Sequence, residues 1–134
     1  MAKWHVLFAV AAAFNFLMGV PLLLVPTWMA SAVGMMVPDD LLFHRIAGAL
    51  IACFGGLYAF IANDPIRYRP LAALGAIGKA TAVVVFTQAW LAGKVPSPAY
   101  ALALGDLAFV VGFLTFLTAA EFKMSMHPQH DRHR

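Results

Sequence analysis

The chain has 134 residues, of which 63% are hydrophobic and 11% are charged, and its mean hydropathy is +0.83. Soluble domains carry about 25% charged and about 45–50% apolar residues, so this composition excludes an ordinary water-soluble fold. The formal net charge of +3 does not indicate a nucleic-acid partner, because the basic residues lie at the ends of apolar stretches and in the C-terminal tail. The length leaves room for about four spans of about 20 residues and for no separate soluble domain.

Four long apolar stretches predict an all-α, polytopic membrane protein, a bundle of four transmembrane helices. The expected spans cover about residues 4–25, 41–62, 70–92 and 99–120. They form one membrane domain over residues 1–121, followed by a basic, histidine-containing tail over residues 122–134. The first stretch is longer than the apolar core of a signal peptide, so we interpret it as a retained helix, although Ala30-Ser31-Ala32 loosely resembles a cleavage site.

The connection between the first two spans, about Pro26–Asp40, is apolar for a loop. A short helix within it would place on one side the apolar residues Met29, Val33, Met36 and Val37. Such a helix is expected to lie in the membrane interface or to cap the outer mouth of the bundle. Asp39 or Asp40 is placed to cap the N-terminus of the second span.

Small residues recur every four positions in the second span, at Gly48, Ala52 and Gly56. In lipid, small residues at this spacing allow helix backbones to approach closely, so the stripe predicts a helix-packing surface. The surface would serve either the packing of this bundle or the assembly of a larger complex.

The distribution of basic residues predicts the orientation in the membrane. With the N-terminus in the cytoplasm, Lys94 is the one basic loop residue on the outer side. The inner side then holds Lys3, Arg67, Arg69, Lys123, Arg132 and Arg134. We therefore expect a multi-pass protein of the bacterial inner membrane with both termini in the cytoplasm. Trp28, Trp90 and Tyr100 would form its outer aromatic belt.

Polar side chains inside the spans are the candidate functional residues. The third span carries Lys79 near its middle, and the fourth carries Asp106 a few ångströms nearer the outer face. The first span contributes Asn15 near mid-membrane, and the second contributes Arg45 and His44 near its outer end. A charge at the bilayer centre costs about 2.5–3.5 kcal/mol on insertion scales, so such residues are usually paired or functional. Together they predict a site that opens toward the outer face.

Two interpretations of this polar cluster remain open. In the structural one, Lys79 pairs with Asp106, and such a pair fixes the register of the helices. Arg45 would then extend to the outer interface, and Asn15 would form an interhelical hydrogen bond. In the functional one, the cluster binds a ligand or handles protons. Two cations and one anion leave a surplus positive charge, which would suit an anionic or electron-rich ligand such as a carboxylate, a sulfur oxyanion or a quinone carbonyl.

Several other chemistries lack support in the sequence. Cys53 is the one cysteine and lies within a span, so a disulfide, a CxxC redox motif and a thiolate metal site are not expected. His5 and His44 lie near opposite faces of the membrane, which disfavours a haem held by both. A solvated tail is favoured over a weak surface metal site for His127, His130 and His133. No metal site and no catalytic residue is assigned, and the sequence leaves open whether the protein is an enzyme.

Three short motifs lie in the second, third and fourth spans: His44-Arg45-x-x-Gly48, Gly78-Lys79 and Gly105-Asp106. Together with four short helices, they resemble the DoxX-like group of small bacterial four-helix membrane proteins over about residues 4–120. Some members of that group are membrane subunits associated with sulfur-compound oxidation and quinone reduction, or with thiol redox balance. The resemblance thus implies a redox-associated membrane subunit, and it assigns no catalytic residue to these positions.

The sequence therefore predicts a small membrane subunit or accessory protein. It would bind a quinone-like or small anionic ligand at Asn15, Arg45, Lys79 and Asp106, or it would support a redox partner. The alternatives are a small-solute transporter or channel that uses Lys79 and Asp106 as a charge relay, and a purely structural subunit. The expected partners are the lipid bilayer and either a larger membrane or redox complex or a second copy of the chain.

Overall fold

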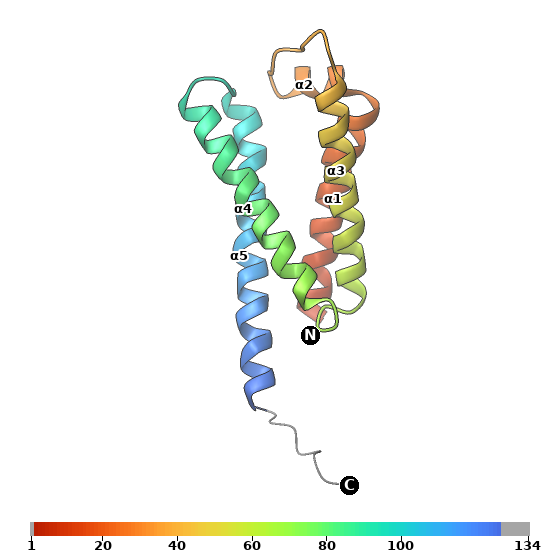
Figure 1. Cartoon of the computed structure of the whole chain (residues 1–134), viewed down its shortest axis with the longest axis vertical. Helices are drawn as coiled ribbons and strands as arrows, with labels where there is room; N and C mark the ends of the chain where they lie inside the picture. The colour runs from red at the N-terminus through yellow and green to blue at the C-terminus, as the bar shows by residue number, and fades with distance from the viewer. Residues whose placement is uncertain (1, 127–134) are drawn as a thin grey trace.

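The computed structural model describes residues 2–126, and all regular secondary structure in this range is helical (Figure 1). The helices are α1 (Ala2–Leu24), α2 (Pro26–Ala32), α3 (Leu42–Asn63), α4 (Arg69–Leu91) and α5 (Ser97–Met126). Four of them, α1, α3, α4 and α5, are long and apolar enough to cross a membrane. The structure thus confirms the all-α class with four membrane-spanning helices, and the chain is a multi-pass membrane protein.

The helices differ from the expected spans mainly at their ends. Pro26, just after the first span, begins the short helix α2. A proline is tolerated in the first turn of a helix, because the N–H that it lacks would have no helical acceptor there. α5 continues past residue 120 to Met126, so the first residues of the expected tail are helical. The rest of that tail, with its three histidines and with Arg132 and Arg134, lies outside the described residues.

The four long helices form two antiparallel pairs that diverge from one another (Figure 1). α1 packs along α3 and α4 packs along α5, whereas contacts between the two pairs are far fewer. The pairs meet at the end that holds the N-terminus and the α3–α4 loop, here called the closed end. They separate toward the end that holds α2 and the α4–α5 loop, here called the open end. The orientation expected from the basic residues makes the closed end the inner one.

Small residues bring α1 and α3 into backbone contact. A Cβ added to Gly48 would lie 2.4 Å from the backbone nitrogen of Leu23, and one added to Gly19 would lie 2.5 Å from that of Ala52. Gly48 and Ala52, two members of the expected stripe, therefore lie in a packing contact within this chain. Gly56 does not take part, since no neighbouring atom lies within 4 Å of the position of its added Cβ.

Four aromatic rings join the two helix pairs in the closed half, and all four are fully buried. Phe8 of α1 stacks on Phe113 of α5 with ring centroids 4.7 Å apart, and it meets Phe116 edge-on at 5.2 Å. Tyr58 of α3 lies 5.2 Å from Phe113. Its ring occupies space that a side chain on Gly75 of α4 would fill, because an added Cβ would lie 2.6 Å from the Tyr58 ring.

The α4–α5 pair is joined near both of its ends. At the closed end, Arg69 Nη2 and Glu121 Oε1 form an ion pair at 2.6 Å. At the open end, the rings of Trp90 and Tyr100 stack with centroids 4.6 Å apart. Because these contacts lie within one helix pair, they stabilise it without holding it against α1 and α3.

The segment between α1 and α3 lies at the open end (Figure 1). Asp40 Oδ1 accepts a hydrogen bond at 2.8 Å from the backbone N–H of Leu42, the first residue of α3. The N-cap position itself is Leu41, so Asp40 supports the helix start from one residue outside the position expected for a cap. The four apolar residues expected on one side of this segment do not share an environment. Met29 and Val33 line the cavity described below, whereas Met36 is 92% exposed and Val37 is also exposed.

Candidate functional site

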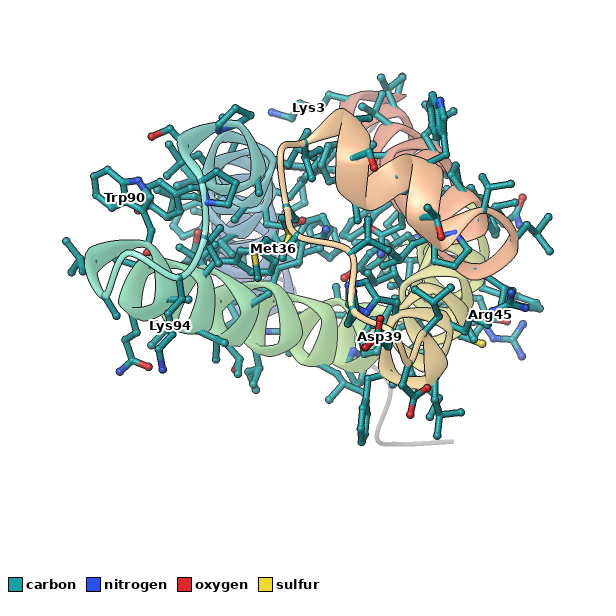
Figure 2. The ribbon with its side chains drawn as sticks, turned by 90° about the horizontal axis from the view of Figure 1, so that it is seen from above. Lys3, Met36, Asp39, Arg45, Trp90 and Lys94 are labelled. Carbon is teal, nitrogen blue, oxygen red and sulfur yellow. The ribbon has the colours of Figure 1, made fainter. Side chains whose placement is uncertain are left out.

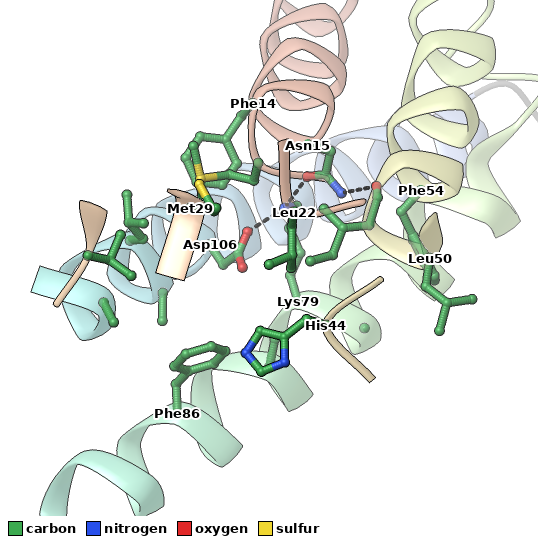
Figure 3. Close-up of a pocket in the computed structure, with 18 of the residues that line it drawn as sticks. Phe14, Asn15, Leu22, Met29, His44, Leu50, Phe54, Lys79, Phe86 and Asp106 are labelled. Atoms are coloured by element: carbon green, nitrogen blue, oxygen red, sulfur yellow. Dashed lines mark hydrogen bonds and ion pairs between the residues drawn. The ribbon is translucent and has the colours of Figure 1, made fainter. Parts of the chain in front are cut away.

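A lysine in the middle of α4 is the centre of a buried polar cluster (Figure 3). Lys79 Nζ donates hydrogen bonds to Asp106 Oδ1 at 2.5 Å and to Asn15 Oδ1 at 2.9 Å. Asn15 Nδ2 donates in turn to the backbone oxygen of Ile51 at 3.1 Å. The side chain of Lys79 is 5% exposed and that of Asp106 is 21% exposed. The pairing expected between Lys79 and Asp106 is therefore present, and their charges offset each other where solvation is poor.

The cluster also links the two helix pairs. Lys79 and Asp106 belong to α4 and α5, whereas Asn15 and its acceptor Ile51 belong to α1 and α3. The hydrogen bond from Lys79 to Asn15 is thus a polar contact between the pairs. It adjoins the aromatic rings of the closed half, because the Lys79 ammonium group also lies against the ring of Tyr58.

Three aromatic rings surround the Lys79 ammonium group. Its Nζ lies 5.4 Å from the ring centroid of Phe14, 5.2 Å from that of Tyr58 and 5.0 Å from that of Phe109. Aromatic faces attract a cation at these distances, and the attraction is stronger where water is excluded. The sequence did not predict these rings. Tyr58 alone carried a usable signal, since it is a tyrosine that lies a full turn inside a span rather than at its end.

A cavity of about 330 Å³ lies between the helix pairs on the open side of the cluster. Its wall is mainly apolar, and the polar side chains Asn15, His44, Lys79 and Asp106 reach it. All four long helices and α2 contribute to it. Three methionines line the cavity: Met18, Met29 and Met35. Of these, the sequence analysis singled out Met29 alone. Methionine side chains are flexible, so this wall can adapt to ligands of different shape.

One carboxylate oxygen of Asp106 has no partner among residues 2–126. Its Oδ1 accepts the hydrogen bond from Lys79, and Figure 3 marks no interaction at the other oxygen. Asp106 lines the cavity, so this oxygen is available to a hydrogen-bond donor on a bound molecule. The cluster is thus satisfied internally and still offers a polar group to the cavity.

The second span places its two polar candidates differently. His44 is half-buried and lines the cavity, as does Phe86 of α4 (Figure 3). Arg45 is exposed and lies on the outside of the molecule (Figure 2). Successive helix residues point about 100° apart, so these two side chains cannot share a face. The expected surplus of positive charge is therefore absent from the cluster, which contains Lys79 and Asp106 as one cation and one anion.

The arrangement has a limited chemical range. Among the described residues, no group of three or more His, Cys, Asp or Glu side chains is placed to hold a metal ion. What the site provides is an apolar chamber with a paired ammonium and carboxylate at its base and an imidazole elsewhere on its wall. Such a site can hold a small, mostly apolar molecule and orient its polar end by hydrogen bonds.

Comparisons of the chain with protein-family models, with curated proteins and with solved structures gave no match. The class of protein thus follows from the fold alone: a multi-pass membrane protein with four spanning helices and a polar cluster at the base of an internal cavity.

Proposed function

We propose that this protein binds a small, largely apolar ligand with an uncharged polar head, such as a quinone-like molecule, in the cavity between its helix pairs. The observation that carries this proposal is the Lys79–Asp106 pair at the base of an otherwise mainly apolar chamber. Ligand sites combine apolar walls with a few polar groups that fix orientation. A quinone-like ring fits this combination, because it is flat and apolar apart from oxygens that hydrogen bond.

The charge balance of the cluster favours an uncharged ligand over a small anion. An anion would leave water and enter a chamber whose one buried cation, Lys79, is already paired with Asp106. Burial of an uncompensated charge is costly, whereas an uncharged carbonyl or hydroxyl group requires only a hydrogen-bond partner. The exposed position of Arg45 thus shifts the proposal toward the quinone-like class.

We place the protein in the bacterial inner membrane, with the closed end toward the cytoplasm. Four basic residues support this orientation at the closed end: Lys3, Arg67, Arg69 and Lys123. At the open end the basic residues are Arg45 and Lys94. The closed end thus holds more Lys and Arg residues than the open end, as the positive-inside tendency requires of a cytoplasmic side. In this proposal the protein is a membrane subunit or accessory protein that holds its ligand for a redox partner.

The two alternative functions have less support. A channel or transporter needs a path past the closed half, and there the rings of Phe8, Tyr58, Phe113 and Phe116 pack together. A purely structural role would leave a small-residue surface for a partner, but Gly48 and Ala52 already contact α1.

The proposal is tested by equilibrium binding of decylubiquinone to the protein in lipid nanodiscs. We expect saturable binding to the natural protein and loss of at least about tenfold in affinity in a Lys79→Met/Asp106→Leu double variant. The double variant removes both charges together, so neither is left buried without its partner.

Arg45→Gln is the matched control, because it removes a charge that lies outside the cavity. It should bind decylubiquinone as the natural protein does. Unchanged affinity in the double variant, or no saturable binding to the natural protein, would contradict the proposal. Native mass spectrometry after gentle extraction then provides an independent test, since a retained lipophilic ligand would appear as a bound mass.

A further inference from the structure

On the α1–α5 side of the cavity, a contact lies at the level of the polar cluster, and the residues of α5 that line the cavity beyond it are buried or half-buried. The ring of Phe14 lies 3.2 Å from the position of a Cβ added to Gly105, so these residues are in contact across α1 and α5. Ala99 and Ala103 line the cavity on α5 and are buried. Nearer the open end, the backbone of Gly34 lies close to Pro96, because an added Cβ would lie 3.8 Å from the proline ring.

The α3–α4 side is closed only at its base. Tyr58 covers Gly75 there, and the ring of Phe54 lies 3.5 Å from the position of a Cβ added to Gly78. Farther toward the open end, Leu50 of α3 lines the cavity and is also 57% exposed. A residue that lines a cavity and is exposed to this extent marks an opening.

We call this opening the α3–α4 window and define it by Leu50 on α3 and by Ala82 and Phe86 on α4, all three of which line the cavity. Ile46, one turn before Leu50 on α3, and Val85, next to Phe86 on α4, are exposed and apolar. The window begins near Gly78, at the middle of a membrane-spanning helix, and extends toward the open end. In a bilayer it therefore faces acyl chains rather than water.

We infer that the ligand enters the cavity sideways from the bilayer, through the α3–α4 window, and that it carries a flexible apolar chain that stays in the window when the head is bound. This inference rests on the proposed function and adds the route and the class of ligand. The ligand is a membrane-dissolved amphiphile with a small uncharged head and an alkyl or isoprenoid chain.

The depth of the polar cluster selects this class over a phospholipid. Lys79 lies near the middle of α4 and is paired with Asp106, whereas a phospholipid headgroup is charged and resides at the membrane surface. A headgroup drawn to this depth would lose its hydration. An uncharged ring is soluble in the hydrocarbon region, so it can reach the window at the depth of the membrane interior.

Leu50→Trp and Ala82→Trp variants test the route, because each fills the window with a larger side chain. Affinity is measured in nanodiscs for decylubiquinone and for the same benzoquinone ring without its decyl chain, at matched concentrations in the bilayer. We expect each variant to lower the ratio of the two affinities by at least about tenfold, since the chain no longer fits beside the bound head. Val84→Trp is the matched control, because Val84 is an exposed residue of α4 that does not line the cavity.

A second measurement uses the natural protein, so it does not depend on the folding of any variant. A decylubiquinone analogue with a diazirine at the end of its chain is photolysed, and the labelled peptides are mapped with and without excess unlabelled decylubiquinone. Competed labelling is expected on the open halves of α3 and α4, around Ile46 and Val85. Competed labelling near Leu17 of α1 or Leu104 of α5 would overturn the inferred route.

The outcomes separate this inference from the proposed function. If neither compound binds saturably, the proposed function fails. If both bind, and the tryptophan variants lower both affinities by the same factor or change neither, the window inference fails while the proposed function stands. A selective loss of the compound with the chain supports both.

Discussion

The closed and open halves of the bundle differ in what holds the helices together. In the closed half, rings from α1, α3 and α5 pack against one another and against Gly75 of α4, so the two helix pairs form one unit. In the open half, contacts lie mostly within each pair, at Gly19 and Gly48 in one and at Trp90 and Tyr100 in the other. A cavity occupies the space between them.

This difference shows how a small membrane bundle can contain a binding chamber. In lipid, burial of apolar surface from water does not drive helix association, so the pairs are held where side chains interlock and separate where they do not. The Lys79 cluster lies at the boundary between the halves. There Tyr58, one of the rings of the closed half, surrounds its ammonium group together with Phe14 and Phe109, and its carboxylate partner Asp106 lines the chamber.

Truncation of an interlocking ring should have the largest effect. Phe113→Ala leaves a void between the pairs, and such voids lower the free energy of unfolding by about 3–5 kcal/mol in soluble cores. We expect a loss of about 2–3 kcal/mol here, because the part of that cost that comes from transfer out of water is missing in lipid. Phe86→Ala enlarges a chamber that already exists, so it should cost less than about 1 kcal/mol. Unfolding by SDS in mixed micelles, followed by circular dichroism, measures both. Equal losses would mean that the two halves are packed alike.

Removal of one member of the ion pair should have the next largest effect. Lys79→Met leaves Asp106 without its cation in a poorly solvated site, and broken buried pairs cost about 3–5 kcal/mol in soluble proteins. We expect about 2 kcal/mol in micelles, where the unfolded state also finds partners. The Lys79→Met/Asp106→Leu double variant should recover at least half of that loss in the same unfolding assay. A double variant that is less stable than the single one would contradict this account of the cluster.

A small-residue contact within a pair should have an intermediate effect. Gly48→Ala places a methyl group against the backbone of α1 and should cost about 1–3 kcal/mol, because the helices must move apart. Gly56→Ala is the matched control on the same helix, and it should be neutral or slightly stabilising, since its added Cβ meets no neighbour. If Gly56→Ala proved as damaging as Gly48→Ala, a partner outside this chain would have to cover Gly56.

Removal of the exposed arginine should have the smallest effect. Arg45→Gln takes away a charge that lies outside both the cavity and the core, so its effect on unfolding should stay within about 0.5 kcal/mol. Thermal unfolding in detergent provides the measurement. A strong loss of stability would instead show that Arg45 interacts with the Lys79 cluster, which would contradict its exposed position.

Sequence reasoning located the cluster but misjudged the rotation of α3. It correctly included His44 and Gly48 among the inward residues, but it also included Arg45, which is exposed, and it chose Gly56 instead of the buried Gly55. A four-residue step advances about 40° beyond a full turn, so a stripe defined by steps of four drifts around the helix. A pattern that alternates steps of four and three from His44, as inward-facing helix residues do, selects Gly48 and Gly55 and leaves out Gly56.

The sequence by itself determined the membrane class, the four spans and the pairing partner of Lys79. Hydropathy follows directly from composition, and a charge in a span needs a partner wherever the helices pack. Only the tertiary structure decided which rings surround Lys79, that Arg45 lies outside the cluster, and that a cavity lies beside the cluster between the helix pairs. These features depend on how each helix is rotated and on how far the pairs diverge, and both are set by side-chain interlocking between residues distant in the chain.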